Sequence, residues 1–417
     1  MNRYDSYKDS GVQWLGEIPS HWEVRKMKFS FDERSDKGYP FLPLLAATQN
    51  HGVIRKDNYE NRTVEASKSL DTLKLVEEGD FVISLRSFQG GIELCHDRGI
   101  ISPAYTILRP THIESCYFKY LGKSPIFIQL LKSMVTGIRE GQNIDYGKLR
   151  DNLLPIPSHK EQEAIANYLD AATSKIDEAI AQQQKMIDLL NERKQIIINN
   201  AVTKGLKPNV KMKDSGVEWI GEVPEHWEII RIKYLLEESK ERSETGNEEP
   251  LSMSQIYGLI PTKQMDIIPN MASSFVGAKI VKEGDLVFNK LKAHLGVFNV
   301  SRYDGLVSPD YAVYKSTGRA NLHFLEYIFK TPKCIHEFVK LITGVGAGLS
   351  RLYTSDLYTI YCALPTIEEQ SSICEFIERK TAKITEAISN CNKHISLLRE
   401  RKQIIINEVV TGKVKVS

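Results

Sequence analysis

The residues best suited to chemistry lie in two loops of the same plan, at 85–91 (LRSFQGG) and 290–296 (KLKAHLG). Each loop combines a cation, hydrogen-bonding side chains and a glycine that lets another backbone approach closely. Arginine, glutamine and asparagine can bond bidentately to the edges of guanine and adenine. The candidate base-contacting side chains of these loops are Arg86, Ser87, Gln89, Lys290, Lys292 and His294.

A second pair of polar segments lies just before two long helical sequences, at 138–143 (IREGQN) and 347–352 (AGLSRL). The two segments differ although they occupy matching places in the chain, so we expect them to contact different targets. For any one of these side chains the competing interpretation is ordinary solvated surface polarity. The candidate DNA-binding residues here are Gln142, Asn143, Ser350 and Arg351.

The sequence carries none of the short motifs that mark common active sites. Gly122-Lys123-Ser124 lacks the first glycine of a phosphate-binding loop, because position 117 is tyrosine. There is no Pro-Pro dipeptide, as the loop of amino-methyltransferases needs, and no His-Glu-x-x-His or Gly-x-Ser-x-Gly. We therefore expect a binding protein with no catalytic residue, metal site or cofactor of its own.

The composition is that of an ordinary globular protein with local basic segments. The chain has 417 residues, 41% hydrophobic and 26% charged, and a formal net charge of +2, with lysine and arginine in excess at 25–56 and 279–302. Its length predicts two or three domains. No apolar run is long enough for a membrane span, and the N-terminus lacks the apolar core of a secretory signal. Six scattered cysteines without a Cys-x-x-Cys pair are typical of a reducing compartment, so we expect a cytoplasmic protein.

An internal duplication explains why these segments come in pairs. Residues 8–24 (KDSGVQWLGEIPSHWEV) recur at 213–229 (KDSGVEWIGEVPEHWEI), with 12 of 17 positions identical. The octapeptide ERKQIIIN also recurs unchanged, at 192–199 and 400–407. The histidines and tryptophans of the repeated block are interpreted as scaffold residues. A repeated scaffold with divergent inserts indicates one task carried out on two targets.

Each half of the chain ends in a predicted long helix. Ser158 with Glu161, and Thr366 with Glu369, predict capping boxes at the helix starts, and a glycine suits the left-handed position after each helix end, at 205 and 412. Apolar residues spaced three and four apart predict a heptad coiled-coil seam, so we expect the two helices to pair antiparallel. The threaded positions are Leu169, Ala172, Ile176, Ala179, Gln183, Met186, Leu190, Arg193 and Ile197 in the first helix, and Ile377, Lys380, Ile384, Ala387, Cys391, His394, Leu398, Arg401 and Ile405 in the second.

The remaining sequence predicts two pseudo-symmetric globular units of the α+β class. Short apolar runs at 81–85, 104–108 and 311–314 are typical of strands, and one helical stretch follows each of Pro125 and Pro332. The predicted domains are a first globular unit, a first long helix, a second globular unit, and a second long helix with its tail, at 1–157, 158–206, 207–365 and 366–417.

This pattern resembles the specificity subunits of type I restriction-modification systems. The resemblance covers nearly the whole chain and is carried by the two Lys-Asp-Ser-Gly-Val-x-Trp blocks, the repeated ERKQIIIN, and the Glu-Gln pairs at 161–162 and 369–370. It implies two target recognition domains, each reading one half of a bipartite double-stranded DNA sequence, with helices that set the gap. It also implies two docked modification subunits, which are adenine methyltransferases, and restriction–motor subunits. S-adenosylmethionine, ATP and Mg would belong to those partners.

The leading hypothesis is therefore a non-catalytic, sequence-specific DNA-binding subunit of a restriction-modification complex. One alternative is a coiled-coil assembly protein whose divergent inserts bind two protein partners and not DNA. Another is an autonomous DNA methyltransferase or nuclease, which the missing motifs disfavour. A methylated split motif with a gap of fixed length would separate the first hypothesis from both alternatives.

Overall fold

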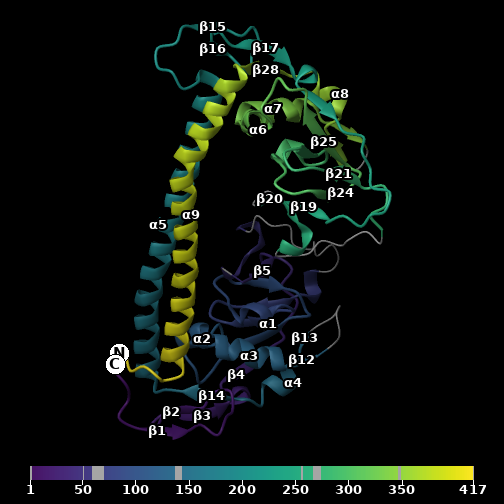
Figure 1. Ribbon diagram of the computed structural model, residues 1–417. Coiled ribbons are helices and arrows are strands. Elements are labelled where there is room, and N and C mark those ends of the chain that lie inside the picture. The colour runs from purple at the N-terminus through teal and green to yellow at the C-terminus, as the bar shows by residue number, and fades with distance from the viewer. Residues whose placement is uncertain are drawn as a thin grey trace. The chain divides into compact units, whose positions relative to one another are not determined.

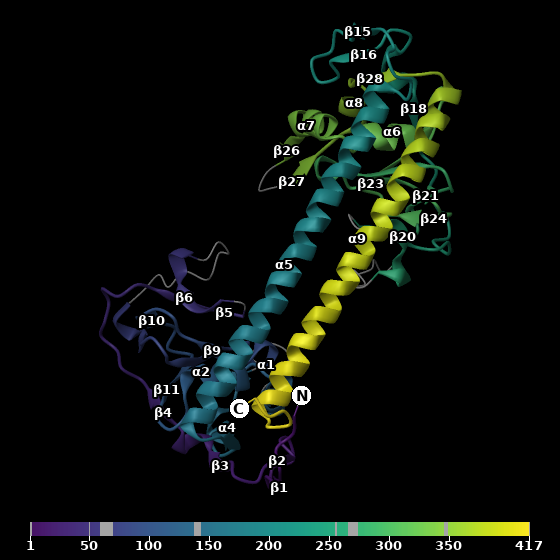
Figure 2. The same cartoon turned by 90° about the vertical axis from the view of Figure 1, so that its left-hand side faces the viewer.

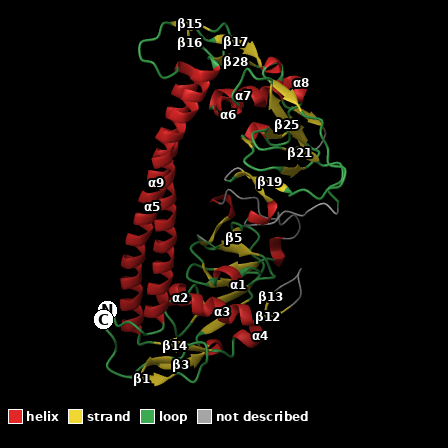
Figure 3. Ribbon diagram, viewed as in Figure 1, coloured by secondary structure: helices red, strands yellow, loops and turns green. Residues whose placement is uncertain are grey.

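The computed structural model describes residues 2–49, 51–58, 70–136, 143–254, 257–265, 274–345 and 349–416. The chain forms two compact units, and each combines strands with helices (Figures 1, 2 and 3). Unit 1 comprises Met1–Gln184 and Asn392–Ser417, and unit 2 comprises Lys185–Cys391. The α+β class predicted from the sequence is confirmed. The two long helices contribute to both units, so unit 1 is built from two segments of the chain, whereas unit 2 is the one continuous segment between them.

Unit 1 is built around a four-stranded antiparallel sheet in the order β4-β11-β8-β9. Its strands are β4 (Phe31–Arg34), β11 (Thr106–Pro110), β8 (Phe81–Ile83) and β9 (Glu93–Leu94). The apolar runs at 81–85 and 104–108 are thus neighbouring strands. The described residues of unit 1 also form five antiparallel pairs: β1 (Tyr7–Asp9) with β2 (Glu17–Pro19), β3 (Glu23–Lys26) with β14 (Leu153–Ile156), β5 (Leu45–Thr48) with β6 (Gly52–Arg55), β7 (Lys74–Val76) with β10 (Gly99–Ile101), and β12 (Val135–Thr136) with β13 (Asn143–Ile144).

Unit 2 repeats this topology strand for strand, which extends the sequence duplication to the fold. Its four-stranded sheet has the order β18-β25-β22-β23. The strands are β18 (Leu236–Glu238), β25 (Tyr311–Ser316), β22 (Leu286–Asn289) and β23 (Phe298–Val300). The pairs are β15 (Met212–Asp214) with β16 (Glu222–Pro224), β17 (Glu228–Arg231) with β28 (Tyr361–Leu364), β19 (Leu251–Ser254) with β20 (Gly258–Pro261), β21 (Lys279–Val281) with β24 (Gly305–Val307), and β26 (Thr343–Val345) with β27 (Leu349–Arg351).

Two consecutive helices follow the central sheet in each unit, where the sequence predicted a single helical stretch. They are α2 (Ser115–Leu121) and α3 (Pro125–Ser133) in unit 1, and α6 (Leu322–Phe329) and α7 (Pro332–Leu341) in unit 2. The second helix of each pair begins at the predicted proline, whose fixed φ suits a first helical turn. The short helices are α1 (Ser87–Gly90), α4 (Tyr146–Leu149) and α8 (Thr354–Leu357), with 3-10 turns η1 (Met27–Phe29), η2 (Lys56–Asn58), η3 (Leu70–Thr72), η4 (Ile232–Tyr234), η5 (Thr262–Gln264) and η6 (Ala293–Leu295).

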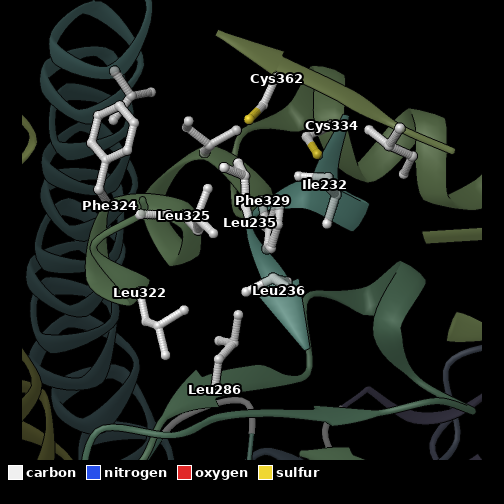
Figure 4. Close-up of a cluster of buried hydrophobic side chains, with 14 of the residues drawn as sticks. Ile232, Leu235, Leu236, Leu286, Leu322, Phe324, Leu325, Phe329, Cys334 and Cys362 are labelled. Carbon is white, nitrogen blue, oxygen red and sulfur yellow. The ribbon is translucent and has the colours of Figure 1, made fainter. Parts of the chain in front are cut away.

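Aromatic rings fill the centre of each unit. In unit 1 the rings of Phe81 and Phe118 meet edge to face, with centroids 4.8 Å apart. Figure 4 shows part of the unit 2 core, in which Leu236 and Leu286 from the sheet lie in one cluster with Leu322 and other side chains of α6. Cys362 lies in the same cluster, and burial raises the pKa of its thiol to about 12. That thiol is therefore a packing group at neutral pH and not a nucleophile.

The predicted long helices are α5 (His159–Lys204) and α9 (Ile367–Val410). In unit 1, Lys402 Nζ lies 2.6 Å from Asp177 Oδ2, and in unit 2, Lys194 Nζ donates to Thr385 Oγ1 at 3.1 Å. The second contact lies 17 residues further along α5 (194 against 177) and 17 residues earlier along α9 (385 against 402). Both contacts therefore share one antiparallel register. The chain ends also meet in unit 1, because Lys415 N donates to Asn2 O at 2.9 Å.

The heptad threading of these helices is corrected by the pattern of burial. Met186, at a predicted seam position, is 49% exposed, whereas its neighbour Ile187 is 6% exposed. Likewise His394 is exposed and Ile395 is buried. On a straight helix a heptad pattern drifts by about 20° every seven residues, whereas a repeat of 11 residues drifts in the opposite sense by about 20° every eleven residues, and so follows one face more closely. Buried isoleucines recur at that interval in both helices, as Ile165, Ile176, Ile187 and Ile198, and as Ile373, Ile384, Ile395 and Ile406.

Candidate nucleic-acid interface

The repeated sequence block holds the start of each long helix. Glu161, at the third position of α5, accepts a hydrogen bond from the Tyr4 hydroxyl at 2.6 Å and lies 3.0 Å from His21 Nε2. Glu369 of α9 lies 2.9 Å from His226 Nε2 in the same way. These contacts confirm that both histidines are scaffold residues.

Each predicted capping box forms one of its two hydrogen bonds, the one accepted by the hydroxyl group. Ser158 Oγ and Thr366 Oγ1 each accept from the backbone N–H three residues on, at 3.4 Å. The glutamates of these boxes bind the histidines, so they do not cap in return. The predicted left-handed glycines are confirmed, because Gly205 and Gly412 both have a φ of 73°.

The glutamine that follows each glutamate ties its helix to the neighbouring loop. Gln162 is fully buried, accepts from Glu114 N at 2.8 Å and donates to Pro157 O at 2.9 Å. Gln370 is also fully buried and makes the equivalent bonds to Asn321 N and Pro365 O, at 2.7 and 2.9 Å. The two Glu-Gln pairs therefore have a structural role in orienting the globular part of each unit on its helix.

The loop at 85–91 separates its polar residues into exposed and buried ones. Arg86 and Gln89 are exposed on α1 and the residue before it. Ser87 is 2% exposed, and its hydroxyl accepts from Ser84 N at 2.8 Å. We therefore assign Ser87 to shaping the loop, while Arg86 and Gln89 remain the side chains free to reach a ligand.

The loop at 290–296 is similarly divided. Lys292 is exposed, whereas Lys290 is mostly buried and lies 3.4 Å from Glu238 Oε1 on β18. His294 is half-buried, and its Nδ1 finds no hydrogen-bond partner within the described part of the chain. Lys292 is thus the predicted contact residue that the fold leaves most accessible in this loop.

The second pair of predicted segments is only partly described. Gln142 lies outside the described residues, and Asn143 is exposed at the start of β13. Ser350 pairs with Gly344 in the β26–β27 hairpin. Arg351 lies 3.0 Å from Asp310 Oδ1, and the next residue donates its N–H to Lys290 O at 3.0 Å. In unit 2 the fold therefore brings the two predicted segments together.

Most cations of the two basic segments are engaged in local ion pairs. Arg34 and Asp80 lie 2.7 Å apart, with side chains 15% and 3% exposed. Lys279 lies 2.8 Å from Glu238 and is 7% exposed. These residues hold strands together, and so the density of lysine and arginine in the sequence overstated the positive charge available to a polyanion.

Lys123 joins two loops in a way the sequence did not reveal. Its ammonium group lies 2.6 Å from Glu93 Oε2 on β9 and donates to Gln49 O at 2.9 Å, in the turn after β5. A Cβ on Gly91 would come within 2.4 Å of Gly122 O, so the loop at 85–91 packs directly on the turn that carries Lys123. The internal repeat is the one feature of the sequence that could have pointed to Lys123. Lys123 precedes Ser124, the N-cap residue of α3, and Lys330 precedes Thr331, the N-cap residue of α7.

Within the described residues, no cluster of three or more histidine, cysteine, aspartate or glutamate side chains could hold a metal ion. The helices of the described segments include none long and apolar enough to cross a membrane.

Comparisons with known proteins place the whole chain in one group of relatives. No family model matches the sequence. The MjaX type I restriction enzyme specificity subunit of Methanocaldococcus jannaschii is 26% identical over 432 residues, covering 96% of both chains. The MjaVIII specificity subunit of the same organism is 23% identical, covering 96% of this chain and 94% of that protein. The chain is a homologue of type I restriction specificity subunits.

A solved structure agrees with this homology at the level of the fold. A chain from a study of complex assembly and conformational transition of the type I R-M system superposes with a TM-score of 0.67, at 14% identity. The match covers 95% of this chain and 99% of that chain. The specificity-subunit homologue therefore shares its fold with that chain.

Proposed function

We propose that this chain is the DNA-recognition subunit of a type I restriction-modification complex, with no catalytic residue of its own. Each unit reads one half of a bipartite double-stranded target, and α5 and α9 set the gap between the halves. The observation that carries the proposal is one strand topology built twice, with different exposed polar residues on equivalent loops. Homology to specificity subunits over 96% of the chain supports the same role.

Docking of two modification subunits is supported by an exposed apolar stripe that occurs once in each unit. On α5 in unit 2, Leu189 and Ile196 are 52% and 53% exposed, and on α9 in unit 1, Leu397 and Ile404 are 53% and 48% exposed. Residues seven apart lie on one helix face. Exposed apolar patches of this kind mark protein interfaces. Two equal stripes suit two copies of one partner, while restriction–motor subunits join the assembly. S-adenosylmethionine, ATP and Mg belong to these partners.

The decisive experiment is co-expression with the neighbouring gene products, followed by mapping of methylated adenines across the genome. The expected result is a split motif with a gap of fixed length. A purified complex that gives no methylated motif and does not retain DNA at moderate salt would support the alternative of an assembly protein for two protein partners.

The loop residues are tested by single replacements in that complex. Arg86→Ala or Gln89→Ala should weaken recognition of one half-site by about 1–3 kcal/mol for each lost base contact, and leave the other half-site unchanged. Lys292→Ala should affect the opposite half-site. Ser87→Ala should act through loop stability, because its hydroxyl is buried. Equal loss of sequence preference at both half-sites in any of these variants would contradict the model of two independent readers.

A further inference from the structure

Unit 1 presents exposed polar side chains at a second place, the turn between β5 and β6. The turn is braced internally, because the Thr48 hydroxyl accepts from His51 N at 3.0 Å and donates to Gly52 O at 2.9 Å. Gly52 has a φ of 71°, and a Cβ there would come within 2.5 Å of Leu94 O. The side chains of Gln49 and His51 are exposed on either side of these contacts.

The equivalent turn of unit 2 has the same hydroxyl contact and left-handed glycine but a different exposed side chain. The sequences are TQNHG at 48–52 and SQIYG at 254–258. Ser254 Oγ accepts from Tyr257 N at 3.3 Å, as Thr48 does for His51, and Gly258 has a φ of 69°. Tyr257 occupies the place of His51 and is 51% exposed. Two units that recognise different targets would need different exposed side chains, here His51 and Tyr257, at equivalent places in the fold.

The turn of unit 1 lies against the loop that carries Arg86 and Gln89. A Cβ on Gly90 of that loop would come within 2.8 Å of Gln49 Cγ. Lys123 donates to Gln49 O and pairs with Glu93, which is 2% exposed and lies just beyond the loop on β9. The turn and the loop therefore form one polar surface, and Lys123 connects both to the turn between α2 and α3.

We propose that the β5–β6 turn is a second DNA-reading element of unit 1, in which Gln49 and His51 contact bases and Lys123 is the positioning residue. Tyr257 is the equivalent specificity-determining residue of unit 2. The inference rests on the proposed function, since the ligand is the same double-stranded DNA. Amide and imidazole groups supply hydrogen bonds to base edges, and a tyrosine ring supplies a hydroxyl and an apolar face.

Unit 2 has a lysine at the place of Lys123, but the carboxylate that pairs with it comes from a different element. Lys330 pairs with Glu326 on α6, which also accepts from Asn299 Nδ2 at 2.7 Å. Asn299 pairs with the central strand of its sheet as Glu93 does in unit 1. A lysine retained between the two helices of each unit, with a substitute carboxylate, indicates that both units need a cation fixed at this point.

The test uses the assembled methyltransferase complex and DNA duplexes that carry changes in one half-site at a time. Gln49→Ala and His51→Ala should each weaken binding to the first half-site about ten-fold, and relax its sequence, with the second half-site unaltered. Tyr257→Ala should do the converse. Asn58→Ala, an exposed residue beyond the turn, is the matched control and should change neither half-site. Unaltered binding and an unaltered methylated motif in both Gln49→Ala and His51→Ala would overturn the proposal. A wild-type complex without any split motif would instead overturn the proposed function.

Lys123 is tested by rescue and by pH. Lys123→Met should weaken the first half-site, and Lys123→Arg should restore most of the binding. Burial raises the pKa of Glu93 to about 7, and Lys123 is the charged group that faces it. As the pH falls from 8 to 6, Glu93 takes up a proton and loses its attraction for Lys123, so first-half-site binding should weaken several-fold relative to the second. The profile is measured in a His51→Gln background, so that the imidazole of the turn plays no part in the comparison. Glu93→Gln should abolish the difference. Parallel pH profiles for the two half-sites before that replacement would exclude the positioning role.

Discussion

Glu161 joins the start of α5 to the N-terminal segment of the chain. Its carboxylate is 8% exposed and serves the Tyr4 hydroxyl and His21 together, 157 and 140 residues away in the sequence. Glu161→Ala leaves the buried Tyr4 hydroxyl without its acceptor, which costs about 1–3 kcal/mol. We expect a lower thermal unfolding midpoint for the purified complex, measured by calorimetry.

Replacements of two other glutamates provide comparisons for the loss of stability in Glu161→Ala. Glu369 has the same role in unit 2 but is 21% exposed, so Glu369→Ala should lower the midpoint by a smaller amount. Glu163 is exposed on the same helix as Glu161, and Glu163→Ala should change stability by no more than about 0.5 kcal/mol. Equal midpoints for the Glu161 and Glu163 variants would show that the buried carboxylate contributes nothing.

At the scale of the elements, α5 and α9 are continuous helices that each contribute to both units, so their length is expected to set the gap in the DNA motif. Inserting four residues after Lys185 in α5 and after Lys393 in α9 lengthens each helix by about 6 Å and rotates it by about 40°. DNA rises about 3.4 Å per base pair, so the methylated motif should keep its half-sites and gain a spacer longer by one to three base pairs.

The antiparallel register explains why both helices must be changed together. The pair Asp177–Lys402 and the pair Lys194–Thr385 each stay within one unit after the double insertion, so both registers survive. An insertion in α5 alone should give a complex that assembles poorly. A well-assembled double-insertion complex that retained the original spacer would assign the gap to the methyltransferase subunits.

For the whole molecule, the two exposed apolar stripes predict how the chain assembles. Without partners, exposed Leu189, Ile196, Leu397 and Ile404 should make the isolated chain self-associate as its concentration rises, as measured by light scattering. Each stripe includes one residue of an isoleucine run, at 196–198 in α5 and at 404–406 in α9. The fold exposes the first residue of each run and buries Ile198, Ile405 and Ile406.

Replacing one stripe should remove one partner. Leu189→Lys with Ile196→Lys should reduce the number of bound modification subunits from two to one in native mass spectrometry, and the equivalent pair on α9 should do the same. Asn191→Lys, at an exposed position turned by about 200° from Leu189 around α5, is the control and should retain both copies. A monodisperse wild-type monomer at high concentration, or full assembly of both double variants, would show that the stripes are not interfaces.

Local chemistry is what the sequence by itself determined. The strands β8 and β11, the helix starts at Pro125 and Pro332, the long helices and their terminal glycines all depend on neighbours within a few residues, and so they could be predicted. The duplication was equally visible, because identical blocks need no structure to be compared. The interpretation of His21 and His226 as scaffold residues followed from that repetition and is confirmed by their contacts with Glu161 and Glu369.

Only the tertiary structure decided which side chains are buried and which residues contact one another. Ser87 is as polar in the sequence as Arg86, yet one is enclosed and the other exposed, because the pair Gly90-Gly91 lets the loop pack on the turn at Gly122. Lys123 acquires its place from Glu93 and Gln49, 30 and 74 residues away. The 11-residue interval of buried isoleucines emerged for the same reason: the apolar residues of these helices exceed one stripe, and only packing against the rest of each unit selects which of them face inward.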